Sequence, residues 1–149
     1  MKNLILSAAM AVTFAVPAVA LACDGAQQTS MSTQPASVKE VSVAELVTLK
    51  KDSKTVVYDA NGADFRAKNG VIPDAKLLTN AVKYDAAKEL PQSKDSKLVF
   101  YCANSKCGAS HQAAKKAIEA GYSDVSVLPV GLMGWKEAGQ PTVKAQPQS

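Results

Sequence analysis

The stretch LVFYCANSKCGASH, residues 98–111, decides the fold of this chain. Leu98 to Tyr101 form an apolar, β-prone run that is typical of a buried parallel strand, and a short polar loop and an alanine-rich segment follow it. In open α/β sheets, ligands bind beyond the carboxyl ends of such strands, which is where Cys102 stands. The sequence therefore predicts a reactive site at Cys102. An inert, buried cysteine is the alternative.

The loop from Ala103 to Gly108 is expected to form a cradle around the sulfur of Cys102. Its backbone N–H groups and the positive end of the following helix would stabilise a negative charge there. Further hydrogen bonds or charge could come from the polar side chains of Asn104, Ser105, Lys106 and Ser110. Such surroundings favour a thiolate, so we predict a lowered pKa for Cys102. A solvated loop lysine is the alternative for Lys106.

Strand and helix patterns alternate on both sides of this stretch. The predicted strands are Val41 to Val43, Thr55 to Tyr58 with Asp59 at its end, and Val125 to Leu128. The predicted helices are 44–49 with Ser42 as its cap, a short one over 84–90, and 109–120 with Gly121 at its end. Residues 70–75 are expected to be extended, and Trp135 to lie in a short helix or turn. This alternation argues for an α/β fold with a parallel sheet covered by helices on both faces.

The first 22 residues have the pattern of a secretory signal peptide. Lys2 gives a positive start, Leu4 to Ala22 is an almost wholly apolar run, and Ala20-Leu21-Ala22 has the small-x-small form of a cleavage site. An uncleaved membrane anchor is the alternative, but Pro17 near the end of the run favours cleavage. We therefore expect a periplasmic or secreted protein that is cleaved near Ala22.

One folded domain is expected after the cleavage site. Residues 23–37 are rich in Gln, Ser, Thr and Ala and are expected to be a disordered leader, residues 38–143 the domain, and residues 144–149 a flexible tail. A lipid on Cys23 would tether the protein to a membrane. The usual lipoprotein pattern has Leu three residues before the cysteine, whereas Ala20 stands there in this chain. We therefore expect no membrane association unless Cys23 is lipidated.

Charge and cysteine content narrow the classes of partner. The 17 basic and 13 acidic residues give a net charge of +4, and all the basic residues but Arg66 are scattered lysines. Nucleic-acid binding favours clustered Lys and Arg with interleaved aromatic residues, so no nucleic-acid partner is expected. A small disulfide scaffold would carry more than three cysteines. In an exported chain, the oxidising compartment could convert these cysteines to a disulfide and so affect the function.

Five segments occur in an order that carries a family resemblance. They are VVYDAN (56–61), FRAKNGVIPDA (65–75), LVFYC (98–102), AGYSDVSVL (120–128) and VGLMGWKEAGQPTV (130–143). Together they make residues 38–143 resemble a rhodanese-like domain. The resemblance implies a parallel five-stranded α/β sheet and sulfur transfer. In that chemistry the cysteine at the strand end takes a sulfane sulfur as a persulfide and passes it to an acceptor such as cyanide or a thiol.

The resemblance also implies roles for particular residues. Cys102 matches the catalytic nucleophile, and Asp59 matches an acidic residue that is expected to orient neighbouring loops. Arg66 and His111 are expected to support the site. The substrate would be bound by the loop and the following helix start, namely Ala103, Asn104, Ser105, Lys106, Cys107, Gly108 and Ser110. The expected partners are a small sulfane-sulfur donor and a thiol acceptor, with no cofactor and no metal.

The chain departs from the family pattern in ways that change the expected donor. The usual loop has Arg five residues after the cysteine and Ser one further on, but here Cys107 holds the first place and Ser110 comes two residues late. Because Arg66 is the only arginine, no loop guanidinium can grip a doubly charged donor such as thiosulfate. Asn61 and Val71 replace the Arg and His of two further family motifs. We therefore expect a donor of lower charge, such as a low-molecular-weight persulfide.

Cys107 leaves more than one function open. It could close a disulfide with Cys102, resolve a Cys102 persulfide with release of hydrosulfide, or be a tolerated cysteine at a helix start. The spacing of Cys102, Cys107 and His111 would also suit a soft metal, although an exposed first-turn histidine that tunes the nearby thiol is favoured. Two functional hypotheses follow. One is an exported sulfurtransferase acting through Cys102, and the other is a non-catalytic or redox-sensing module with a Cys102/Cys107 dithiol–disulfide pair.

Overall fold

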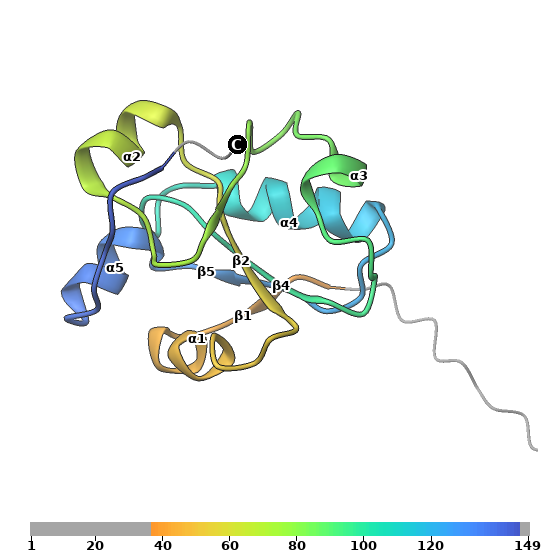
Figure 1. Cartoon of the computed structure of the whole chain (residues 1–149), viewed down its shortest axis with the longest axis horizontal. Coiled ribbons are helices and arrows are strands. Elements are labelled where there is room, and N and C mark those ends of the chain that lie inside the picture. Colours follow the sequence, from red (N-terminus) through yellow and green to blue (C-terminus); the bar gives the residue numbers. More distant parts are fainter. Residues whose placement is uncertain (1–36, 147–149) are drawn as a thin grey trace, which may run out of the picture. The chain divides into compact units, whose positions relative to one another are not determined.

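Five parallel strands form one sheet in the part of the chain that the structure describes (Figure 1). The computed structural model describes residues 37–146, so the predicted signal peptide, most of the predicted leader and the last three residues lie outside it. The strands are β1 (Lys39–Glu40), β2 (Thr55–Asp59), β3 (Lys76–Leu77), β4 (Lys97–Tyr101) and β5 (Val125–Leu128). Their order is β1-β5-β4-β2-β3, which puts β4 in the middle. The predicted parallel five-stranded sheet is confirmed.

Helices cover both faces of the sheet, as predicted (Figure 1). They are α1 (Val43–Leu49), α2 (Ala63–Asn69), α3 (Ala86–Glu89), α4 (Ala109–Glu119) and α5 (Gly131–Glu137). One hydrophobic cluster joins Leu98 and Phe100 of β4 to α3 and α4. The other joins Val99 and Tyr101 of β4 to α1 and α5. Successive strand residues point to opposite faces, so the apolar run of β4 contributes to both clusters.

Burial fixes the position of β4. Its residues from Leu98 to Tyr101 are all fully buried. Phe100 stacks on Tyr58 of the neighbouring strand with the ring centroids 5.3 Å apart, and the Tyr101 hydroxyl accepts a hydrogen bond from the backbone N–H of Ile72. Burying a large apolar side chain stabilises a fold by roughly 1.5–3 kcal/mol. The end of β4, where Cys102 follows, is therefore held firmly in place.

Helix α4 packs closely on the sheet through small residues. Ala113, Ala114 and Ala117 are fully buried, whereas Lys115 and Glu119 are exposed. After the helix, Gly121 adopts φ +93°, a conformation that suits glycine. The predicted helix over 109–120 is confirmed, and its first turn lies directly after the loop that begins at Cys102.

The predicted strand from Val41 to Val43 is wrong. Strand β1 ends at Glu40, and Val43 is the first residue of α1. The Ser42 side chain accepts a hydrogen bond from the Glu45 backbone, and the Glu45 carboxylate accepts one from the Ser42 backbone. This capping box starts the helix one residue earlier than the apolar pattern suggested, because the reciprocal pair satisfies two free N–H groups.

Three shorter elements refine the sequence predictions. The extended connection over 70–75 leads into β3, which pairs with β2 over only two residues. The helix predicted over 84–90 is the single turn α3, capped by the Asp85 side chain on the Ala87 backbone. Trp135 lies in α5 and donates a hydrogen bond to the carbonyl of Pro141. Each element is too short for a periodic pattern to define its bounds.

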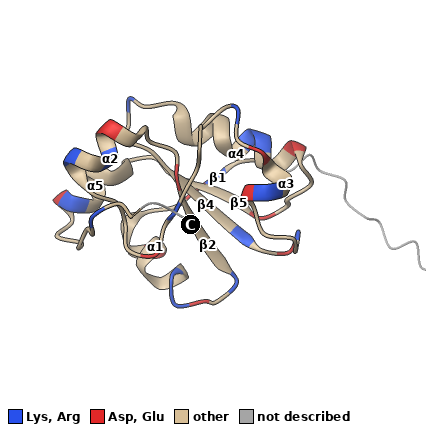
Figure 2. Cartoon of the chain, turned by 45° about the horizontal axis from the view of Figure 1, so that its top comes forward, with Lys and Arg blue, Asp and Glu red and all other residues tan. Residues whose placement is uncertain are grey.

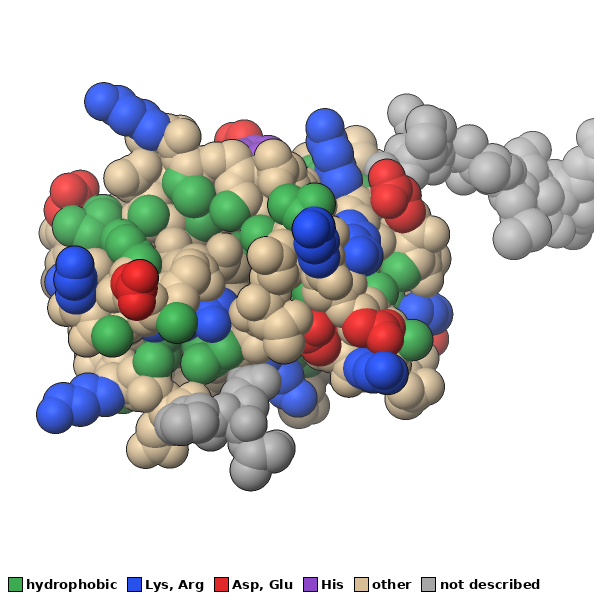
Figure 3. All heavy atoms as spheres, turned by 90° about the horizontal axis from the view of Figure 1, so that it is seen from above, with side chains coloured by type: hydrophobic (Ala, Val, Ile, Leu, Met, Phe, Trp, Pro, Cys, Tyr) green, Lys and Arg blue, Asp and Glu red, His purple; other side chains and the backbone are tan. Residues whose placement is uncertain are grey.

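Charged side chains are dispersed over the elements. Figure 2 shows lysines and acidic residues interspersed on helices and loops, and the face in Figure 3 mixes both charges with hydrophobic side chains. The mild positive charge is therefore not concentrated on that face. Among residues 37–146, no helix has the length and apolar character needed to cross a membrane.

Candidate active site

Cys102 follows the last residue of β4, at the carboxyl end of the central strand. Asp59, the last residue of the neighbouring strand β2, is paired with Tyr101. Beyond that pair the two strands are joined by a hydrogen bond from Ala60 N to Tyr101 O. The predicted location at the edge where ligands bind is thus observed. The side chain itself is only 1% exposed, so its sulfur is shielded from solvent in this conformation.

Backbone carbonyls, rather than N–H groups, face much of the Cys102 sulfur. The thiol donates to the carbonyl oxygen of Cys107 at 2.9 Å and lies 3.9 Å from that of Asn104. Ser110, in the first turn of α4, places its hydroxyl oxygen 3.4 Å from the sulfur. The first turn of α4 lies against the sulfur, as expected. The loop, however, turns the carbonyl oxygens of Asn104 and Cys107 toward the thiol instead of the expected N–H groups.

The pKa of Cys102 is raised, opposite to our prediction. The main cause is burial, which disfavours the charged thiolate, and the hydrogen bond with Cys107 adds to it. The Ser110 hydroxyl and backbone act in the other direction but do not outweigh these effects. In this conformation Cys102 is therefore a neutral thiol that serves as a hydrogen-bond donor.

Cys107 has the opposite character. It is partly exposed, and although burial alone would raise the pKa of its thiol, hydrogen bonds from Cys102 and from the backbone of Ala103 and Ala109 lower it. A hydrogen-bond donor near a thiolate stabilises the charged form. Both cysteines are free. The thiol of Cys107 therefore ionises more easily than that of Cys102.

The exposed part of the loop is organised by Asn104. Its side-chain oxygen accepts a hydrogen bond from Lys106 N, and its backbone carbonyl accepts one from Cys107 N, both at 3.0 Å. Asn104 therefore shapes the turn, and its side-chain oxygen acts as an acceptor within the loop. Ser105, Lys106 and Gly108 are exposed and Ala103 is partly buried, so the Lys106 charge points to solvent.

Helix α5 holds the start of the loop. Leu132 N donates to the carbonyl of Cys102 at 2.8 Å, and Met133 N donates to that of Ala103 at 2.9 Å. Gly131, with φ +61°, allows this approach, since a Cβ there would lie 2.6 Å from the Cys102 oxygen. The sequence analysis missed this contact. Its only signal was a glycine directly before an apolar helical turn.

Asp59, at the end of β2, and Arg66, in α2, form a buried ion pair. The carboxylate accepts hydrogen bonds from Arg66 Nε at 3.1 Å and from Asn61 N at 2.6 Å. The guanidinium also donates to the backbone carbonyls of Asp59 and Leu78. These contacts tie β2 to the segment after β3, and the orienting role expected for Asp59 stays a prediction. Its second carboxylate oxygen is buried without a hydrogen-bond partner.

A family model for the rhodanese-like domain matches residues 42–138, about two thirds of the chain. The chain belongs to the rhodanese-like domain family. An uncharacterized protein of Synechocystis is 38% identical over 58 residues, which cover 39% of this chain and only 31% of that protein. The chain therefore spans less than a third of the length of this curated relative.

Solved structures share the rhodanese-like fold. A protein of unknown function from Rhodopseudomonas palustris, described as a possible tyrosine phosphatase, is 27% identical with a TM-score of 0.60, covering 71% of this chain and 85% of that one. The rhodanese-like domain of an Anabaena protein is 20% identical (TM-score 0.60; 73% and 81% covered). A thiosulfate sulfurtransferase from Pseudomonas aeruginosa is 22% identical (TM-score 0.60; 73% and 21% covered). The last two likenesses concern the fold alone.

This rhodanese-like chain has no arginine at its reactive loop. Arg66 is 8% exposed and fully engaged by Asp59 and two backbone carbonyls. The place five residues after Cys102 is taken by Cys107, whose backbone carbonyl accepts a hydrogen bond from the thiol of Cys102. The loop therefore offers a second sulfur where a cationic anchor is usual.

His111 does not join the two cysteines. Its Nε2 atom lies 3.9 Å from a carboxylate oxygen of Glu40, and its side chain is 43% exposed. No cluster of three or more His, Cys, Asp or Glu side chains suited to a metal occurs within residues 37–146. The alternative of a metal held by Cys102, Cys107 and His111 is therefore not supported, and neither is a direct effect of His111 on the thiols.

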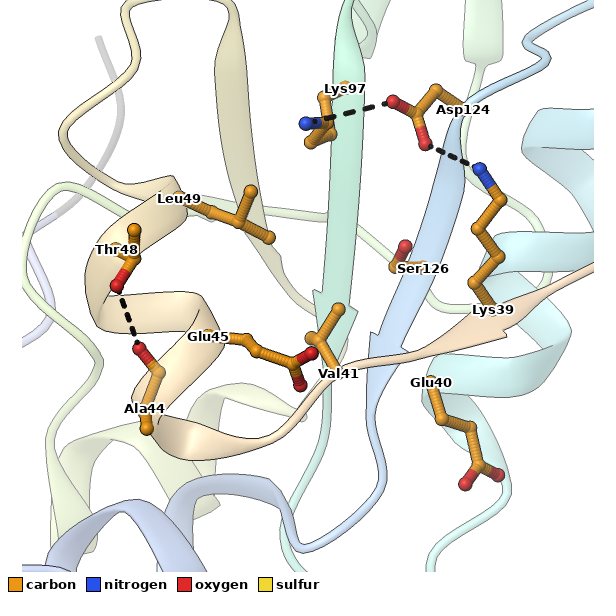
Figure 4. Close-up of a pocket in the computed structure, with 10 residues that line it drawn as sticks. All are labelled: Lys39, Glu40, Val41, Ala44, Glu45, Thr48, Leu49, Lys97, Asp124 and Ser126. Carbon is orange, nitrogen blue, oxygen red and sulfur yellow. Dashed lines mark hydrogen bonds and ion pairs between the residues drawn. The ribbon is translucent and has the colours of Figure 1, made fainter.

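A pocket of about 590 Å³ lies away from the two cysteines. It is lined by β1, α1 and the starts of β4 and β5, including Lys97 and Asp124 (Figure 4). Lys97 is the first residue of β4, and Cys102 follows the last, so pocket and thiol are at opposite ends of this strand. Asp124 is bound there by Lys39 at 3.2 Å and Lys97 at 3.9 Å. No cysteine lines this pocket.

Proposed function

We propose that this rhodanese-like protein is an exported sulfurtransferase that carries sulfane sulfur as a persulfide on Cys102 and delivers it to a thiol acceptor. The observation that carries the proposal is the placement of Cys102 at the carboxyl end of the central strand, with the first turn of α4 against its sulfur through Ser110. A helix start favours a negative charge. A persulfide anion on Cys102 would gain from that position.

The donor in this proposal is a persulfide of a small thiol. A thiosulfate or phosphate dianion is best held by a bidentate guanidinium, and the one arginine of the chain is buried beside Asp59. The same argument disfavours a tyrosine phosphatase activity for this chain. A thiol persulfide needs no such anchor, because its charge is lower and thiolate attack on sulfur requires only access.

The place of action in this proposal is the periplasm or the exterior. The basis is the signal-peptide pattern of residues 1–22, which lie outside the described residues. The proposal includes no nucleic-acid partner, and membrane association only through a lipid on Cys23. In an oxidising compartment, the Cys102/Cys107 pair must be reduced by a thiol before each cycle if it forms a disulfide.

A second candidate function is a dithiol–disulfide switch. The favouring observation is the 2.9 Å hydrogen bond from the Cys102 thiol to the backbone carbonyl of Cys107, which places the two cysteines side by side in the loop. Oxidation of this pair would remove the proposed persulfide carrier. The switch and the transferase make different predictions for the reduced protein, since only the transferase gains sulfur.

Mass spectrometry of the reduced protein tests the proposal. The protein, with Cys23→Ser to remove the third cysteine, is mixed with cysteine persulfide, trapped with an alkylating reagent and digested. We expect the mass of one additional sulfur atom on the peptide that contains Cys102, and loss of that sulfur when a thiol acceptor is added. Cys102→Ser is expected to abolish the gain of sulfur on that peptide, because the carrier is missing.

The outcome against the proposal is equally clear. Reduced protein that takes no sulfur on either loop cysteine, but forms a Cys102–Cys107 crosslink on oxidation, supports the switch. Thiosulfate serves as the second donor in the same assay. We expect slower loading from thiosulfate than from cysteine persulfide, because the loop has no bidentate partner for the dianion.

A further inference from the structure

The two loop cysteines differ in what a molecule from solution can reach. Cys102 is 1% exposed, and its sulfur is enclosed by the carbonyls of Cys107 and Asn104 and the hydroxyl of Ser110. Cys107 is partly exposed and is flanked by the exposed residues Lys106 and Gly108. A donor that approaches the loop without opening it therefore meets the sulfur of Cys107 first.

The two cysteines also differ in which of them carries the proton. The Cys102 thiol donates a hydrogen bond to the backbone carbonyl of Cys107 at 2.9 Å, and burial raises its pKa, whereas the pKa of Cys107 is lowered by hydrogen bonding from its surroundings. The thiolate, and not the thiol, attacks sulfur. The outer cysteine is thus the more accessible and the more easily ionised of the two.

We propose that Cys107 is the first acceptor of the sulfane sulfur and passes it inward to Cys102. This inference rests on the proposed sulfurtransferase function and adds to it the route of the sulfur and the class of donor. The donor must bring its outer sulfur to a partly exposed thiolate, which a persulfide of a small thiol can do.

The first step is an exchange at the donor. The Cys107 thiolate attacks the outer sulfur of R–S–SH, a Cys107–S–SH bond forms, and the donor S–S bond breaks to release the thiolate R–S⁻. Neither cysteine is oxidised to a disulfide, since one S–S bond replaces another. No external oxidant or reductant is consumed.

The second step moves the sulfur inward. Cys102 attacks the outer sulfur of Cys107–S–SH, and the S–S bond to Cys107 breaks. As it attacks, the Cys102 thiol gives up its proton, which the departing Cys107 sulfur takes, and Cys102–S–SH is left beside Ser110. The alternative attack on the inner sulfur would give a Cys102–Cys107 disulfide and hydrosulfide, and it would end the relay.

Variants with one loop cysteine test the order of loading. In the Cys23→Ser background, Cys102→Ser keeps a hydroxyl that can donate to Cys107, and Cys107→Ser keeps the size of the outer side chain. Each reduced variant is mixed with cysteine persulfide and quenched with iodoacetamide at short times. We expect Cys102→Ser to load sulfur on Cys107 at the rate of the parent. We expect Cys107→Ser to load Cys102 slower by about tenfold or more, because a buried thiol replaces an accessible thiolate.

A pH profile tests whether the Cys102 side chain lowers the pKa of Cys107. Cys102→Ala removes the donor that Cys102→Ser retains, so the midpoint of Cys107 alkylation with pH should lie higher in the alanine variant. In the serine variant it should stay below that of an ordinary thiol, because hydrogen bonds still stabilise the thiolate. Equal midpoints in the two variants would remove this support for the relay. Circular dichroism and urea unfolding verify that both variants are folded.

The inference and the proposed function fail in different ways. If Cys107→Ser loads Cys102 as fast as the parent, Cys107 is not the first acceptor, while the sulfurtransferase function stands. If the parent rapidly releases hydrosulfide and accumulates a Cys102–Cys107 disulfide, the inward transfer is wrong. If no loop cysteine of the parent gains sulfur, the sulfurtransferase function itself fails.

Discussion

The two sides of the loop from Cys102 to Gly108 are built in contrasting ways. On the inner side, backbone N–H groups of α5 donate hydrogen bonds to the carbonyls of Cys102 and Ala103, and the buried Asp59–Arg66 pair lies at the end of the neighbouring strand β2. On the outer side, Asn104 closes an exposed turn, and Lys106 points to solvent. The inner side fixes where the sulfur stands, and the outer side decides what can reach it.

The contrast concerns how firmly each side of the loop is held. Buried hydrogen bonds are rigid because losing one leaves an unpaired polar group, which costs about 1–3 kcal/mol. The exposed turn has no such constraint, since water can replace its hydrogen bonds. Substitutions on the two sides should therefore differ in size, and three of them measure the difference.

The largest effect is expected from Arg66→Met. It leaves the Asp59 carboxylate buried without its partner, and breaking a buried pair typically costs about 3–5 kcal/mol. The matched control is Lys39→Met, which removes a similar 3.2 Å contact to Asp124 whose lysine is 62% exposed. Exposed pairs contribute about 0–1 kcal/mol. Urea unfolding of both variants measures the free energies, and equal losses would refute the contrast.

Gly131→Ala should have the next largest effect. Its Cβ would meet the Cys102 carbonyl at 2.6 Å and backbone atoms of Ala103 and Asn104 at 2.7 Å. Gly139→Ala is the matched control, because it also has a positive φ, of +72°, but nothing within 4 Å of its Cβ. A left-handed alanine costs about 1–2 kcal/mol at either position.

The clash should add about 1–3 kcal/mol at residue 131 alone. Thermal unfolding measures this difference, and the loading assay shows whether the displaced loop slows sulfur uptake. A Gly131→Ala protein that is as stable as Gly139→Ala would mean that the start of the loop yields easily. The inner side would then be less rigid than its hydrogen bonds suggest.

The smallest effect is expected from Asn104→Ala on the outer side. It removes the hydrogen bond to Lys106 N, which contributes about 0.5–1.5 kcal/mol. Asn104→Asp is the control, since it keeps the acceptor oxygen. We expect little change in unfolding but a changed rate of Cys107 alkylation in the alanine variant. A loss of stability as large as that of Arg66→Met would place Asn104 among the rigid parts of the site.

The sequence was sufficient to predict the sheet and the position of Cys102. The apolar run before Cys102 is typical of a buried strand, and the alanine face of residues 109–120 is typical of a helix packed on a sheet. Both patterns depend on residues close together in the sequence, so they can be recognised without knowledge of the tertiary contacts. The strand at Val41 failed because the capping box at Ser42 outweighed a weak two-residue alternation.

The protonation states could not be predicted in the same way. They depend on how deeply Cys102 is buried and on which backbone groups turn toward it, and both are set by tertiary packing. The contact of α5 with the loop joins residues about thirty positions apart along the chain. No periodic pattern records such a contact. The lowered pKa is therefore found at Cys107 and not at Cys102, for which it was predicted.

The central place of β4 has a consequence for how the molecule opens. This strand is paired on both sides and buried on both faces, so its amide protons should exchange with solvent only through near-global unfolding. The turn from Asn104 to Lys106 has few such anchors and should exchange through small local openings. Access to the inner thiol can thus fluctuate on its own, while the strand that carries it keeps its place.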